Sequence, residues 1–239
     1  MSAIKGIINA PQDLYASSST QGTDLGAFAT TGDGREFRYV KAGASALVPG
    51  TLVQAPAQTT ANQDLGVVAA SIGAKTLTVA SSTTVTANAL TGGFVATTTG
   101  TGYGYAYKIA GNLASAASSL VITLEDPIVV ALDTTTKIDL VPSPYNGVVV
   151  NPTTASSAPL GAAITAIPAS NYGWIQTKGV VPLTASSALT VGLGVAPSTA
   201  TAGNVIASTT FTASVPGQIG FAVTGVAANE TGLVDLRPF

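Results

Sequence analysis

Short runs of β-branched and aromatic residues, many of them ended by a glycine or a proline, recur along this chain of 239 residues. Apolar or alternating runs of this length are typical of β-strands, and no segment has the periodicity of a helix of convincing length. The clearest predicted strands are 76–79, 120–124, 128–132, 137–141, 147–150, 172–181 and 218–226. The chain is therefore predicted to be all-β, with an antiparallel β-sandwich or barrel-like body.

The first clear hairpin joins 28–31 to 35–41 through the turn Gly32–Gly34. Glycine adopts positive φ without steric strain, which a tight turn between two strands often requires. In the second arm, Phe37 and Tyr39 alternate onto one face of the predicted strand.

Arg35, Arg38 and Lys41 lie among Phe37 and Tyr39 and form a basic and aromatic cluster. Such a cluster could stack nucleic-acid bases, but acidic residues are interspersed with the basic ones. A solvated hairpin face, or the charged rim of an interface, is the favoured interpretation.

Charge is scarce along the whole chain. Only 8% of residues are charged and the net charge is −2, whereas a soluble domain usually carries roughly 25% charged residues. Binding to nucleic acid or to an anionic membrane needs clustered lysine and arginine, so neither partner is expected. A surface this poor in charge repels other copies weakly, and interface centres are depleted of charge. The composition predicts a subunit of an assembly.

The chain contains no cysteine and no histidine. Disulfides, thiolate metal sites, His-ligated zinc and the usual Ser-His-Asp and Cys-His nucleophiles are thereby excluded. An enzyme that uses only carboxylates or lysine stays open as an alternative. The favoured prediction is that the protein is no enzyme, with no catalytic, cofactor-binding or metal-ligating residue.

Four carboxylates close together in sequence, Glu125, Asp126, Asp133 and Asp139, could supply oxygen ligands to a cation. Their spacing matches no calcium loop, and nothing in the sequence sets the separation that a general acid and base need. Solvated strand ends are the favoured interpretation.

The glycine-rich segment Gly100–Gly104 superficially resembles a phosphate-binding loop. Phosphate binding of that kind requires a following helix N-terminus, whereas 105–109 is predicted to be a strand. A β-turn is therefore predicted. Tyr103, Tyr105 and Tyr107 are expected to share one face, for core or interface packing rather than for sugar binding.

The predicted organisation is an N-terminal arm, 1–31, followed by a β body, 32–239, with possible subdomains 36–150 and 160–239. The polar stretch 16–23 has too little apolar surface to order itself alone. We expect the arm to serve attachment rather than folding of the body, with an ordinary frayed terminus as the alternative.

No membrane association is predicted. The first fifteen residues lack the apolar region of a secretory signal. Prolines divide the uncharged region 140–177, and a membrane helix needs roughly 20 unbroken apolar residues.

Five segments together resemble a pattern found in structural proteins of tailed bacteriophages. They are the YGWIQTKG string at 172–179, the EDP strand end at 125–127, the PYNG turn at 144–147, and the segments DGREFRYVKAG at 33–43 and SALVPGTLV at 45–53. Trp174, in the first of them, is interpreted as a core residue.

The resemblance implies a noncatalytic head decoration or cement protein of the virion. Such a protein is made in the cytoplasm of the host bacterium and binds the outer face of the major capsid protein lattice. A homotrimer is the expected form, because a lattice offers three-fold positions and closed rings protect strand edges. The alternatives are a fibre or tail-associated module that binds a receptor or glycan, and a carboxylate-based glycosidase on the virion.

Overall fold

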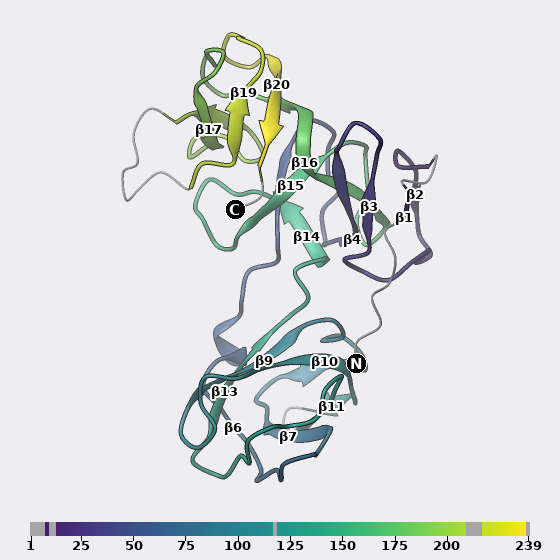
Figure 1. The fold of residues 1–239 in the computed structure, drawn as a ribbon, viewed down its shortest axis with the longest axis vertical. Helices are drawn as coiled ribbons and strands as arrows, with labels where there is room; N and C mark the ends of the chain where they lie inside the picture. The colour runs from purple at the N-terminus through teal and green to yellow at the C-terminus, as the bar shows by residue number, and fades with distance from the viewer. Residues whose placement is uncertain (1–7, 10–12, 117–118, 209–216, 238–239) are drawn as a thin grey trace. The chain divides into compact units, whose positions relative to one another are not determined.

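The computed structural model describes residues 8–9, 13–116, 119–208 and 217–237, and it confirms the all-β prediction (Figure 1). Within these residues, the helical element is the single 3-10 turn η1 (Thr60–Asn62). The chain forms two compact units. The inserted unit comprises residues 58–143, and the flanking unit is built from the chain on both sides of it.

The inserted unit is a closed sheet of short strands. The strands pair in the order β6 (Leu65–Gly66), β13 (Lys137–Val141), β9 (Phe94–Thr99), β10 (Ala106–Asn112), β12 (Ser119–Leu124) and β7 (Thr76–Ala80). A bridge between Val67 and Val79 joins the two ends of this order. β8 (Thr84–Val85) and β11 (Ser115–Ala116) pair with each other and form a separate two-stranded sheet.

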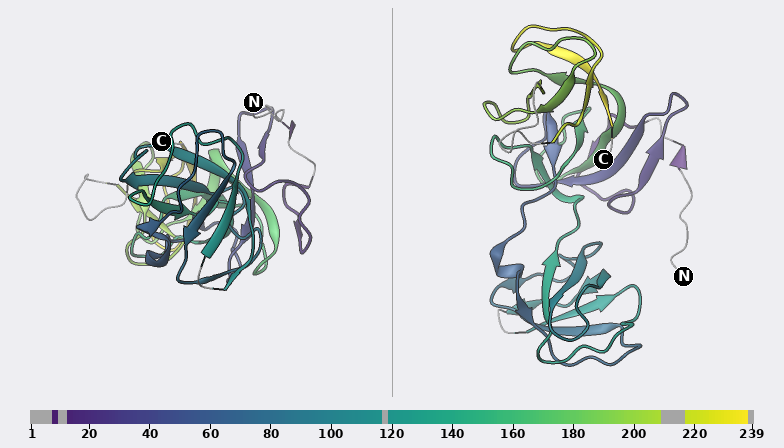
Figure 2. Two further views of the ribbon diagram at one scale, coloured as in Figure 1. Left: turned by 90° about the horizontal axis from the view of Figure 1, so that it is seen from below. Right: turned by 60° about the vertical axis from the view of Figure 1, so that its left-hand side comes forward.

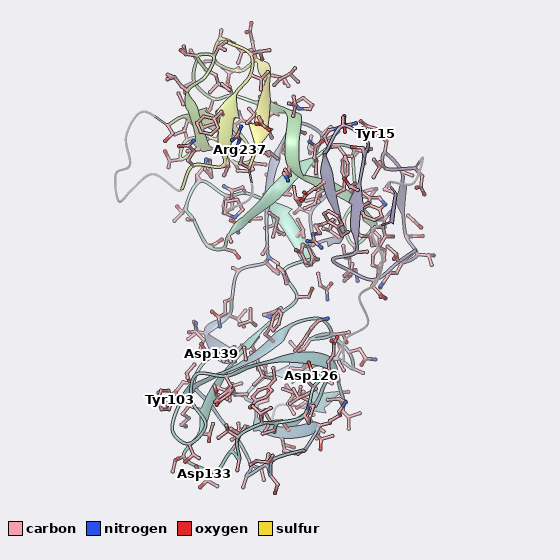
Figure 3. All side chains as sticks on the ribbon, viewed as in Figure 1. Tyr15, Tyr103, Asp126, Asp133, Asp139 and Arg237 are labelled. Atoms are coloured by element: carbon pink, nitrogen blue, oxygen red, sulfur yellow. The ribbon has the colours of Figure 1, made fainter. Side chains whose placement is uncertain are left out.

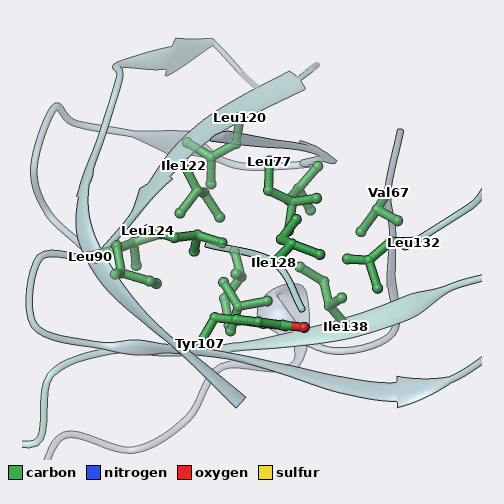
Figure 4. Packing of buried hydrophobic residues seen from close by; sticks show 14 residues of the cluster. Val67, Leu77, Leu90, Tyr107, Leu120, Ile122, Leu124, Ile128, Leu132 and Ile138 are labelled. Carbon is green, nitrogen blue, oxygen red and sulfur yellow. The ribbon is translucent and has the colours of Figure 1, made fainter. Parts of the chain in front are cut away.

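Alternation along the strands builds the core of the inserted unit, because successive side chains of a strand point to opposite faces. Leu120, Ile122 and Leu124 of β12 are all buried, and they pack with Leu77 and Ile138 from neighbouring strands (Figure 4).

The flanking unit contains a central barrel of five strands. The ring runs β4 (Glu36–Ala42), β14 (Asn146–Val150), β5 (Leu52–Gln54), β15 (Pro159–Ala163) and β16 (Tyr172–Thr184), and β16 pairs again with β4. The pairing of β14 with β4 is parallel, whereas the other four pairings are antiparallel. Its interior is filled by Val40, Val53, Val148, Ile167 and Ile175, among others.

The long strand β16 belongs to two barrels. Its second half, from Gly179 onward, pairs with β20 (Thr231–Leu236), and the order continues through β19 (Gly220–Ala222), β17 (Gly194–Pro197) and β18 (Val205–Ala207). A bridge from Val205 to Ala185 returns to the end of β16. This C-terminal barrel appears in green and yellow in Figure 2 and has its own buried cluster, which includes Val181, Leu183 and Val234.

The structure divides the chain differently from the predicted subdomains 36–150 and 160–239. β4 and β5 precede the inserted unit in sequence, yet they pair with β14, β15 and β16, which follow it. The predicted boundary near 150 therefore falls within one barrel. Strand partners so far apart in sequence leave no local signal, because a strand's own residues specify its faces but not its neighbour.

The predicted arm, 1–31, is also revised. β3 (Phe28–Thr30) pairs with β4, and β2 (Ser17–Ser18) pairs with β16. Leu14 is buried against Phe37, Tyr39 and Trp174. β1 (Ile8–Asn9) pairs in parallel with β3. From Leu14 onward the segment is therefore part of the flanking unit, while residues 1–7 lie outside the described part of the chain.

Candidate functional site

A hollow lined by ion pairs lies within the flanking unit, and we call it the charged cleft. Its volume is about 760 Å³. Three elements that are distant in sequence form it: the β3–β4 turn, β16 where it passes between the barrels, and the end of β20. The charged residues that line it are Asp33, Arg35, Lys178, Asp235 and Arg237.

Each cation of the charged cleft has a carboxylate partner close by. Arg35 Nε lies 2.8 Å from Asp33 Oδ2, and Arg237 Nη2 lies 3.1 Å from Asp235 Oδ2. Lys178 Nζ lies 2.9 Å from Glu36 Oε1 at the edge of the hollow. The charges are thus balanced locally.

The carboxylate in the β3–β4 turn is held in its charged form. The hydroxyl of Thr31 donates a hydrogen bond to Asp33, and this bond is the largest cause of a pKa below the ordinary value. The N–H and guanidinium of Arg35 act in the same direction. Because hydrogen bonds to the ionised form lower the pKa of a carboxyl, Asp33 is a stable anion at neutral pH.

Gln176 and Gly179 determine the course of β16 past the cleft. The Gln176 side-chain amide is buried and donates to the carbonyl oxygens of Lys178 and Val180, each at 3.0 Å. Gly179 has φ of +85°, and a Cβ at this position would lie 2.9 Å from Arg35 Cγ. A glycine is therefore required where the strand turns from one barrel to the next.

A second hollow of about 360 Å³ adjoins the charged cleft, since Leu236 and Arg237 line both. Arg38 also lines it, so all three arginines of the chain border these two hollows. The Arg38 guanidinium lies 4.9 Å from the Phe28 ring centre and donates to Gly26 O at 3.0 Å. Aromatic stacking and a backbone carbonyl thus hold Arg38 in place.

Apolar side chains cover the sheet surface beside the charged cleft. On β16, β19 and β20, alternate residues fill the C-terminal barrel, and the residues between them point outward. Val180, Asp235 and Phe221 form one row across the three strands, and Pro182 lies opposite Leu233 in the next. We call the exposed apolar side chains of this surface the outer face: Val180, Pro182, Phe221, Val223 and Leu233.

The basic and aromatic cluster of the first hairpin is divided between two environments. Phe37 and Tyr39 are buried, and Tyr39 meets Trp174 edge to face at 5.2 Å. Trp174 is 5% exposed, which confirms its prediction as a core residue. Lys41 lies over the Tyr172 ring at 5.4 Å. The rings of Phe37 and Tyr39 therefore serve packing, since burial removes their faces from any stacking ligand.

The four predicted carboxylates are not brought together. Glu125 pairs with Lys108 at 2.9 Å, and Asp139 accepts a hydrogen bond from the Asp64 N–H at 2.9 Å. Figure 3 shows Asp126, Asp133 and Asp139 at separate places on the inserted unit. Among the described residues, no group of three or more acidic side chains could hold a metal ion.

Asp133 has a local structural role in a turn. The Thr101 hydroxyl donates to it at 2.6 Å, and the N–H and hydroxyl of Thr135 donate at 2.8 and 2.6 Å. These bonds, that from Thr101 first, hold the pKa of Asp133 below its ordinary value. The carboxylate ties the β9–β10 loop to the turn before β13.

The glycine-rich loop and the tyrosines follow the prediction in part. Gly100–Gly104 joins β9 to β10, so it is followed by a strand and not by the helix that a phosphate-binding loop requires. Tyr107 is buried in the core, whereas Tyr105 and Tyr103 are exposed. Tyr103 is labelled in Figure 3. Tyr105 and Tyr107 still stack, with ring centres 6.3 Å apart.

Sequence reasoning did not single out Lys178, Asp235, Arg237 or the outer face. One signal was present: six charges of a charge-poor chain occur as the close pairs 33/35, 36/38 and 235/237. Their convergence depends on β16 and β20, which pair across some fifty residues of sequence.

Comparison with family models, with curated protein sequences and with solved structures finds no match to this chain. Among the described residues, no helix is long and apolar enough to cross a membrane.

Proposed function

We propose that this protein is a noncatalytic outer subunit of a bacteriophage virion, a head decoration or cement protein. In this role it binds the outer face of the major capsid protein lattice as a homotrimer and stabilises the head. The proposal combines the five phage-like sequence segments with the surface chemistry of the two units.

The observation that carries the proposal is the number of large apolar side chains on the surface of so weakly charged a chain. Sixteen of them, among the described residues, are 37–71% exposed. Contiguous exposed apolar surface marks interaction sites in soluble proteins. The outer face is such a surface, built on paired strands, and a docking role therefore fits it better than a reaction centre.

The carboxylates support the same conclusion. Glu125, Asp133 and Asp139 each contact a different local partner, and a structural role for each agrees with the proposal. Alanine at these positions is expected to affect stability alone.

Binding to particles tests the proposal. Purified protein is added to heads made without it, and occupancy is measured by electron microscopy together with the temperature at which the heads release DNA. We expect saturable binding to the outer surface and a higher release temperature. Binding only to tails or host glycans would instead support the fibre alternative, and no binding to heads would refute the decoration role.

A further inference from the structure

The outer face is an unusually regular apolar surface for this chain. Its side chains project from paired strands. The Val223 N–H donates to Leu233 O at 2.8 Å, which continues the pairing of β19 with β20 beyond Ala222. Phe221, Val223 and Leu233 are each about two-fifths exposed. Because β20 pairs with β16 on one side and with β19 on the other, the surface is preformed and needs little ordering on binding.

The ion pairs beside the outer face restrict what can cover it. Three cations, Arg35, Lys178 and Arg237, face three carboxylates at the charged cleft. A partner of one charge sign would meet as many repulsive as attractive groups. A second copy of the chain carries the same balanced set, and a two-fold axis can bring its cations to the carboxylates of the first copy.

These ion pairs are also able to exchange partners. The side chains of Arg35, Lys178 and Arg237 are 30%, 46% and 66% exposed. Exposed pairs of this kind contribute only about 0–1 kcal/mol each, so their rearrangement across an interface costs little.

We propose that the outer face and the adjoining Asp235–Arg237 pair form a two-fold contact between two copies of this chain. Apolar side chains make the centre of the contact and the ion pairs make its charged rim, the arrangement usual in protein interfaces. This inference rests on the proposed function, in which such a contact joins neighbouring trimers across the two-fold positions of a lattice.

The mass of the protein in solution tests the apolar centre of the proposed contact. We expect Leu233→Glu and Phe221→Glu, which lose the contact, to sediment as a smaller species than the unaltered protein. Val48→Glu is the matched control, because Val48 is an exposed apolar residue of the same unit outside the outer face. It should keep the full mass. Circular dichroism must show that all three variants are folded.

Charge-reversal variants of the Asp235–Arg237 pair test the charged rim and the two-fold symmetry of the contact. Asp235→Lys leaves only cations at this pair and Arg237→Glu only carboxylates, so each variant should repel its own copies and sediment as a smaller species than the unaltered protein. An equimolar mixture should recover the full mass through a mixed contact. Failure of the mixture to recover it would exclude the two-fold arrangement of these charges.

The same experiments separate this inference from the proposed function. If the unaltered protein and Leu233→Glu have equal mass at every concentration, the two-fold contact is refuted, even where both bind phage heads. If Leu233→Glu has a smaller mass than the unaltered protein while the unaltered protein binds no head, the contact stands and the decoration role is refuted.

Discussion

At the scale of the residue, the Gln176 side chain stabilises β16 at the point where this strand passes from one barrel of the flanking unit to the other. Its amide satisfies two backbone carbonyls where β16 leaves one barrel and enters the other. The amide is buried, so water cannot replace these two hydrogen bonds in the folded protein, and each contributes about 0.5–1.5 kcal/mol. Asp33 has the corresponding role in the β3–β4 turn, through the Thr31 and Arg35 hydrogen bonds.

We expect Gln176→Leu to lower the free energy of unfolding of the flanking unit by about 1–3 kcal/mol, because two side-chain hydrogen bonds to backbone carbonyls are lost. Denaturant unfolding followed by tryptophan fluorescence measures the change, since Trp174 is the single tryptophan. Gln21→Leu, at an exposed position of the same unit, should change it by less than about 0.5 kcal/mol. Equal effects of the two substitutions would contradict this role.

The charge of Asp33 makes the β3–β4 turn sensitive to acid. Its folded pKa lies below the unfolded value of about 3.9, so the stabilisation is present above that value and is lost as pH falls through the folded pKa. Carboxyl NMR should show Asp33 titrating below pH 3.9, and Thr31→Ala should move the midpoint upward. A midpoint at or above 3.9 in the unaltered protein would show that the Thr31 bond is absent in solution.

At the scale of elements, β4 and the first half of β16 carry buried side chains on both faces. Val40 and Ile175 fill the central barrel, whereas Phe37 and Trp174 point out of it and are covered by the N-terminal segment. Alternation predicted Phe37 and Tyr39 on one face of the hairpin, but it could not show that this face is covered. Leu14, in the segment predicted to be an arm, is one of the residues that cover it.

Leu14→Ala should therefore destabilise the flanking unit, by about 2–3 kcal/mol, since large-to-small changes at buried leucines cost at least this much. Thermal unfolding provides the measurement, and Ser19→Ala, at an exposed position of the same segment, is the control. Deletion of residues 1–26 should likewise lower the midpoint. An unchanged midpoint of thermal unfolding in both variants would instead support the prediction that this segment is an attachment arm.

At the scale of the whole molecule, the chain contains an insertion. Residues 58–143 have their own buried core, and the residues on both sides of them complete the flanking unit. A unit with its own core and closed sheet is expected to fold independently.

We expect residues 58–143 to fold when expressed alone, and the flanking unit to fold when a short glycine-serine linker replaces them. Circular dichroism and cooperative thermal unfolding test both. The fragment 36–150 should fail to give cooperative unfolding of its barrel strands, because it separates β4 from β16. Cooperative unfolding of β4, β5 and β14 within that fragment would argue against the insertion.

The sequence by itself determined the fold class and many of the strands. The runs 76–79, 120–124 and 137–141 lie in β7, β12 and β13, because alternation and β-branched residues act locally. The prediction for 128–132 was wrong. This segment has no regular strand, and Ile128 and Leu132 are apolar because they fill the core from a loop.

Only the tertiary structure decided which strands pair, where the units divide and which charges meet. The period of a strand assigns its residues to two faces, but the neighbour that covers each face is selected by packing over the whole chain. Arg35, Lys178 and Arg237 are 59 to 202 residues apart in sequence, and they converge because β16 pairs with β4 along its first half and with β20 along its second.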